Sequence, residues 1–175
     1  MALFTERELG DLLTGFRETA FRFETRDRYN SDVGRESFRR FLAGEPDDYP
    51  WHRWWLDMIQ RDLAAGKVWQ RVRIVSVPVS DWTRYGVEVA RLSVAVGEDI
   101  RYLRRDAAEQ MGLTPYDSWI FDGDQLVHLH FNDHDDTFVG AELVTDGKAV
   151  QRHQAWRDLA WAHAQTLEDF VASVP

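Results

Sequence analysis

The second half of the chain, residues 68–164, is a regular succession of strand and helix patterns, and this order constrains the fold most. A buried strand pattern over residues 71–77 leads through Pro78 into a helix opened by Ser80 and Asp81. Further strand patterns follow at residues 99–103, 119–122, 125–131 and 140–144, before a long terminal helix over about 147–172. Interleaved helices and strands, with a run of strands late in the chain, predict an α/β or α+β fold in which helices flank a mixed β-sheet.

The first 66 residues carry mainly helical patterns. Thr5 and Glu8 form a capping-box pair that predicts a helix over residues 6–15. Residues 20–25 alternate apolar and polar side chains as a half-buried strand does, and two further helices are expected over 33–43 and 50–66. At 175 residues we therefore expect a single domain, 1–175, with a mostly helical N-terminal part (1–66) and an α/β core (67–175).

The composition excludes several classes of protein. The formal net charge of -9 is unfavourable for contact with a phosphate backbone, so we expect no direct binding to nucleic acid, although an acidic domain can dock onto a basic protein. The chain has no cysteine, which excludes disulfides and thiolate chemistry. No apolar run reaches the length of a signal peptide or a membrane helix, so the cytoplasm is the expected location and no membrane partner is expected.

Arginines on neighbouring strands suggest a site for an anion. Arg71 and Arg73 alternate with Val72 and Ile74 and therefore share one face of a strand. Ligands of open α/β sheets bind outside the carboxyl ends of strands, and a guanidinium there pairs well with a carboxylate or a phosphate. The candidate ligand-binding residues are Arg71, Arg73, Ser80, Asp81, Arg84, Tyr85, Arg101 and Asp122. The alternative, which we favour, is that these arginines form internal salt bridges to Glu88, Glu98, Asp99 or Asp122.

A histidine-rich strand offers a second candidate. His128 and His130 lie two residues apart on a strand, and with Asp133 or Asp135 they could bind Zn²⁺ or Mn²⁺. The alternative interpretation is a solvated strand face, shared with Leu126, that runs into an acidic turn, because Val127, Leu129 and Phe131 form the obvious core face. Neither a nucleophile elbow nor a glycine-rich phosphate loop is present, and no cofactor is implied.

Several short segments together resemble an uncharacterised family of small cytoplasmic proteins from actinobacteria. They are residues 21–29, 41–46, 71–76, 80–85, 97–101, 119–122, 140–144, 152–157 and 160–163. The resemblance implies a protein encoded beside helix-turn-helix regulators of the Xre type. The second half also resembles half of a phospholipase-D-like domain whose catalytic His-x-Lys is missing, since Asp117, Ser118 and Trp119 occupy those positions.

These observations favour a non-enzymatic regulatory or interaction domain. It would bind a partner protein, such as an Xre-type transcriptional regulator, or a small anionic effector. The alternative is a metal-assisted hydrolase that uses His128, His130 and Asp133. A third option is a homodimer whose subunits meet through Trp51, Trp54 or Trp82.

Overall fold

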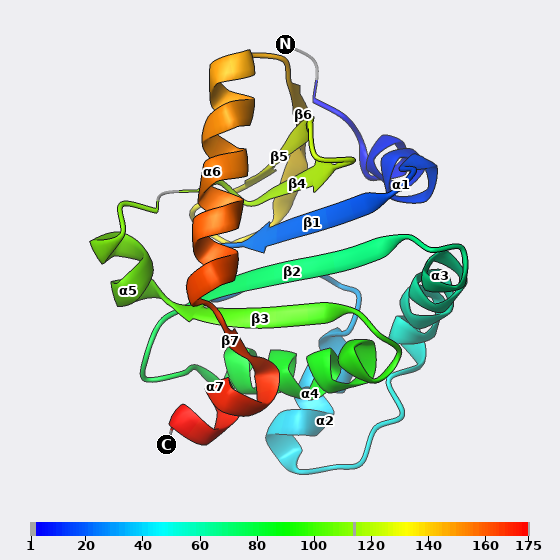
Figure 1. Ribbon diagram of the computed structural model, residues 1–175. Coiled ribbons are helices and arrows are strands. Elements are labelled where there is room, and N and C mark those ends of the chain that lie inside the picture. The colour runs from blue at the N-terminus through cyan, green and yellow to red at the C-terminus, as the bar shows by residue number, and fades with distance from the viewer. Residues whose placement is uncertain (1–2, 114, 175) are drawn as a thin grey trace.

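The computed structural model describes residues 3–113 and 115–174, which form a seven-stranded sheet in the order β6-β5-β4-β1-β2-β3-β7 (Figure 1). The strands are β1 (Thr19–Glu24), β2 (Val68–Val75), β3 (Asp99–Arg104), β4 (Ser118–Phe121), β5 (Gln125–Phe131), β6 (Phe138–Val144) and β7 (Gln165–Thr166). The helices are α1 (Glu6–Gly15), α2 (Arg35–Ala43), the 3-10 turn η1 (Pro50–His52), α3 (Arg53–Ala64), α4 (Asp81–Ala95), α5 (Arg105–Gln110), α6 (Gly147–His163) and α7 (Leu167–Ser173).

The sheet is mixed, as the sequence predicts. β1, β2 and β3 run parallel, whereas β4, β5 and β6 are joined antiparallel at one side and β7 pairs antiparallel with β3 at the other. The crossovers between the parallel strands are helical, which is the usual solution for a parallel pair. β1, from the mostly helical first part, occupies the centre of the sheet, so the core of the domain includes both halves of the chain.

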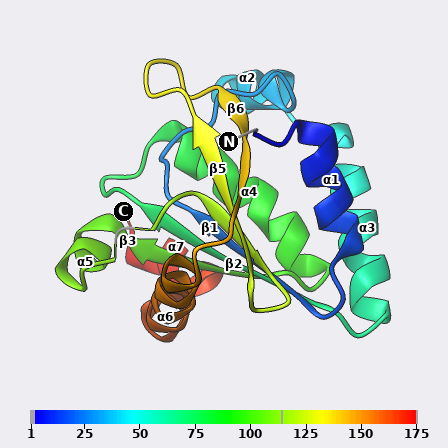
Figure 2. The same ribbon diagram turned by 90° about the horizontal axis from the view of Figure 1, so that it is seen from above.

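Helices cover both faces of the sheet (Figure 2). α5 and α6 pack on one face over Phe21, Val72 and Leu126, and α1, α3 and α4 pack on the other. The expected solvated face of β5 is therefore wrong: Leu126 is fully buried and His128 is half-buried, because α6 packs over them.

Helix caps and turns that depend on residues close together in the sequence agree with the structure. Thr5 and Glu8 form the predicted capping box at the start of α1. The Asp-Gly pair at residues 122 and 123 predicts a hairpin turn between β4 and β5, and both residues adopt positive φ angles there, 51° and 84°. The predicted terminal helix, in contrast, is interrupted. α6 ends at His163, β7 then pairs with the edge of β3, and Thr166 caps the separate helix α7.

The topology confirms the α/β class. It does not show the more specific resemblance to a phospholipase-D-like half domain, which stays a prediction. None of the helices in the described part of the chain is both long enough and apolar enough to cross a membrane.

Candidate ligand-binding site

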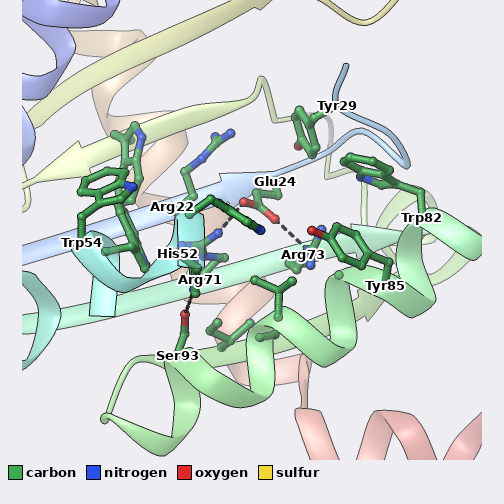
Figure 3. A pocket seen from close by; sticks show the side chains of 17 residues that line it. Arg22, Glu24, Tyr29, His52, Trp54, Arg71, Arg73, Trp82, Tyr85 and Ser93 are labelled. Atoms are coloured by element: carbon green, nitrogen blue, oxygen red, sulfur yellow. Dashed lines mark hydrogen bonds and ion pairs between the residues drawn. The ribbon is translucent and has the colours of Figure 1, made fainter. Parts of the chain in front are cut away.

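A cavity of about 270 Å³ lies between one face of the central strands and the helices that cover it (Figure 3). Strands β1, β2 and β4 form its floor, α3 and α4 form its walls, and η1 and the loop that carries Tyr29 complete the lining. The cavity lies over the sheet face and beneath α4, rather than outside the carboxyl ends of the strands.

The parallel register of β1 and β2 places four charged side chains side by side on the cavity floor. Arg22 on β1 lies opposite Arg71 on β2, and Glu24 lies opposite Arg73, so all four side chains share one face. Glu24 accepts from both arginines of β2: its Oε1 is 2.6 Å from Arg71 Nη1, and its Oε2 is 2.6 Å from Arg73 Nε. Figure 3 shows Glu24 between these two guanidinium groups.

The charge state of Glu24 follows from this arrangement. Burial alone would raise the pKa of Glu24, but Arg73, Arg71 and Arg22 outweigh that effect and lower the pKa to about 2. The carboxylate is therefore ionised throughout the physiological range. A group held so firmly in one state has little use as a general acid or base near neutral pH.

The other two buried acids of this region are also fully engaged. Glu98 accepts from Arg71 Nε at 2.9 Å and from the indole of Trp55 at 3.2 Å. Asp117 accepts from Arg22 Nη2 at 2.6 Å and from the hydroxyls of Thr25 and Tyr29 at 2.6 and 2.8 Å. Each of these carboxylates therefore already has two or more donors from the protein.

The guanidinium of Arg73 has fewer acidic partners than Arg71, the other arginine of β2. Its Nε is paired with Glu24 and the hydroxyl of Tyr102 lies beside the guanidinium, but within the described chain no second acid pairs with its terminal nitrogens. The guanidinium lies against Gly86 of α4, where a Cβ atom would come within 2.6 Å of Nη1. The lack of a side chain at residue 86 is therefore what lets the guanidinium sit under the helix.

Aromatic side chains form the walls and the mouth. Trp54 is 58% exposed, and Trp51 and Trp82 are half-buried, whereas Tyr85 and Trp55 lie deeper. Figure 3 shows Trp54 and Trp82 on opposite sides of the arginine floor. The Trp and Met residues of α3 have the helical spacing of core side chains, and Trp55 and Met58 are indeed buried, but Trp54 is exposed and lines the cavity.

One serine–histidine contact borders the cavity. His52 Nε2 lies 3.0 Å from Ser93 Oγ, and burial, together with Arg71, lowers the pKa of His52 to about 4. Ser93 is only 2% exposed and lies inside α4, and in the described residues no carboxylate hydrogen-bonds to His52. Without an accessible hydroxyl or an orienting acid, this pair lacks the parts of a nucleophilic site.

The structure brings together only some of the candidate residues. Arg71, Arg73 and Tyr85 line the cavity. Ser80 instead caps α4, and Asp81 forms a surface pair with Arg84 at 3.5 Å.

Arg101 and Asp122 lie away from the cavity. Arg101 stacks on Trp161 of α6, on the opposite face of the sheet, with its Cζ 3.8 Å from the ring centroid. Asp122 accepts from the backbone amides of residues 17–19, at the start of β1. The internal salt bridges we favoured do occur for Arg71 with Glu98 and for Arg101 with Asp99, while Glu24 is a partner the sequence analysis did not name.

Sequence reasoning missed Arg22 and Glu24, and it named Trp51, Trp54 and Trp82 only as a possible homodimer contact. The segment from Phe21 to Glu24 alternates apolar and charged side chains, as β2 does around Arg71 and Arg73. That shared pattern was the available signal, because two neighbouring strands with charges on the same face can pair them.

The histidine cluster is divided among separate partners. His128 Nε2 lies 3.2 Å from His153 Nε2, His130 Nε2 lies 2.9 Å from Glu142, and Asp133 pairs with Arg26 at 3.1 Å. In residues 3–113 and 115–174, no three His, Asp or Glu side chains are grouped so that they could hold a metal ion. The arrangement gives the proposed metal-assisted hydrolase no ligand set.

Comparison with known families places this geometry in context. A family described as a domain of unknown function, DUF6879, matches residues 7–172. The chain belongs to the DUF6879 family. A search of curated proteins finds no match. The match covers both the sheet and all the elements that line the cavity, so the candidate site lies inside the family domain and not in an appendage.

Proposed function

We propose that this DUF6879 domain is a non-enzymatic regulatory domain that binds a small anionic effector in the aromatic cavity. One observation carries the proposal: the acidic groups of the floor each have two or more donors, whereas in the described chain Arg73 pairs with one acid, Glu24, through its Nε. A guanidinium that lines a cavity is best satisfied by an oxygen anion that takes two parallel hydrogen bonds from its nitrogens.

The chemistry of the cavity supports binding rather than turnover. Glu24, with a pKa of about 2, holds no proton near neutral pH, and burial raises the pKa of Tyr85 to about 12, so that its phenol keeps its proton. The site thus presents groups in fixed protonation states, which suit recognition better than proton transfer.

A thermal-shift screen tests the proposal. The protein is heated with millimolar small organic anions as sodium salts, with sodium chloride as the reference. We expect at least one anion to raise the melting temperature, because a ligand that binds only the folded state stabilises it. Arg73→Gln should abolish that shift, and Arg84→Gln, which changes an exposed arginine outside the cavity, should preserve it. A shift that survives Arg73→Gln, or no shift with any anion, contradicts the proposal.

A protein partner is the second candidate. Its supporting observations are the net charge of -9 and the large apolar side chains that remain exposed, among them Trp54, Tyr116 and Val139. The resemblance to proteins encoded beside Xre-type regulators makes a basic DNA-binding protein the partner to test. A purified neighbouring regulator mixed with the domain should co-elute in size-exclusion chromatography with light scattering. The same run on the domain alone decides whether it forms a homodimer.

A further inference from the structure

We infer that the effector is a planar aromatic monocarboxylate whose carboxylate pairs with Arg73 and whose ring lies among the indoles of the cavity mouth. This inference rests on the proposed function and specifies its ligand. It follows from the charged residues of the cavity floor, from the planar guanidinium of Arg73, and from the tryptophan side chains at the cavity mouth.

The charge balance limits the ligand to a single negative charge. The floor holds three cations, Arg22, Arg71 and Arg73, and the three anions that pair with them, Glu24, Glu98 and Asp117. A monoanion can share Arg73 with Glu24, because a guanidinium presents donors on more than one edge. The second charge of a dianion would face Glu24 in a poorly solvated site with no further cation to offset it.

The available donors match a carboxylate. Arg73 uses Nε for Glu24, no second acid of the described chain pairs with its two terminal nitrogens, and a pair of such donors in one plane fits the two oxygens of a carboxylate. The same feature argues against an organic cation in the aromatic cavity, since both oxygens of Glu24 are already engaged and Arg73 would repel it.

The walls favour a flat ring. Trp51, Trp54 and Trp82 come from η1, α3 and α4, and all three keep part of their surface accessible at the cavity. Rings placed among them gain stacked or edge-to-face contacts beyond the area that they bury. The volume of about 270 Å³ lies just below the usual range for drug-sized ligands, so a single ring or a fused pair of rings fits best.

Isothermal titration calorimetry near neutral pH with a matched set of probes tests the inference. Benzoate and indole-3-carboxylate are the expected binders. Cyclohexanecarboxylate has the charge without the planar ring, phenyl phosphate has the ring with a second charge, and benzamide has the ring without the charge. We expect the aromatic carboxylates to bind at least about ten-fold more tightly than each of these three.

Variants assign that affinity to the cavity. Arg73→Gln should weaken benzoate binding by about ten-fold or more, since a charge-assisted pair is lost, and Arg84→Gln should leave it unchanged. If Arg73→Gln fails to fold, Trp82→Leu at the cavity mouth serves instead and should reduce the preference for benzoate over cyclohexanecarboxylate.

The outcomes separate this inference from the proposed function. Equal or tighter binding of cyclohexanecarboxylate or phenyl phosphate, still dependent on Arg73, overturns the aromatic monocarboxylate but leaves an anion-binding domain. The absence of binding by either aromatic carboxylate also overturns the inference, and the wider anion screen then decides the function independently.

Discussion

Gly86 of α4 and Arg73 of β2 are in direct contact: a Cβ atom at residue 86 would lie 2.6 Å from Arg73 Nη1 and 3.0 Å from Nη2. α4 thus has no side chain at the point where the guanidinium of Arg73 packs against it. This contact connects the most constrained helical position of the cavity with the group that we propose to bind the ligand.

Gly86→Ala should therefore separate ligand binding from stability. The methyl group displaces the flexible end of Arg73, which weakens benzoate binding by about ten-fold. The cost of crowding is offset by the helix preference of alanine, about 1 kcal/mol, so the free energy of unfolding should change by about 1 kcal/mol or less. Titration calorimetry and urea denaturation measure the two effects. Gly10→Ala in α1, with no atom within 4 Å of its Cβ, is the matched control and should leave binding unchanged.

Removal of the charge of Glu24 should be costly. Glu24→Gln keeps the shape of the side chain but leaves Arg71 and Arg73 without their shared anion. Breaking a buried ion pair from one side costs about 3 kcal/mol or more in free energy of unfolding. Urea denaturation measures this loss. Glu36→Gln, which interrupts exposed pairs with Arg39 and Arg40, should cost much less because solvent screens those pairs, and equal losses in the two variants would contradict the arrangement described.

The elements that could be predicted from the sequence are those specified by nearby residues. The capping box at Thr5 and the turn at Asp122 and Gly123 each depend on contacts a few residues apart, and both are confirmed. The split between α6 and α7 depends on β7 pairing with β3, about 60 residues earlier in the chain, and no local pattern reports such a pairing.

The candidate site shows the same limit. Alternation identified Arg71 and Arg73 as residues of one strand face, but their main counter-ion, Glu24, lies on a strand 47 residues away from Arg71. Only the parallel register of β1 and β2 brings these side chains together. The indoles of the mouth have the helical spacing of core residues, and only the packing of α3 against the sheet distinguishes buried Trp55 from exposed Trp54.

Three histidines whose pKa is lowered by burial, His52, His128 and His153, should make the stability of the domain depend on pH. Burial lowers the pKa of His52 and of His128 from 6.5 to about 4, with Arg71 and His153 respectively adding to the effect. Between these values the unfolded chain binds protons that the folded chain does not. The free energy of unfolding should therefore fall as the pH decreases from about 6.5 to about 4. Urea denaturation across this window measures the slope.

Variants identify the source of this dependence. His52→Gln and His128→Gln should each reduce the slope, because each removes one site that titrates differently in the two states. His134→Gln changes an exposed histidine of the loop between β5 and β6 and is the matched control. A slope that is the same in all three variants would assign the pH dependence to other groups.

Asp122 should act on stability and not on ligand binding. Its carboxylate accepts from the amides of Arg17, Glu18 and Thr19 at 2.7 to 3.2 Å and so holds the start of β1 against the β4–β5 turn. Asp122→Ala leaves these amides unpaired and places alanine at a φ of 51°, so a loss of about 2 kcal/mol is expected in urea denaturation. Asp122→Asn, which tolerates that φ, should lose less. Benzoate affinity should stay at the wild-type value in both variants, because Asp122 does not line the cavity. A weakened affinity would indicate that Asp122 contributes to ligand binding.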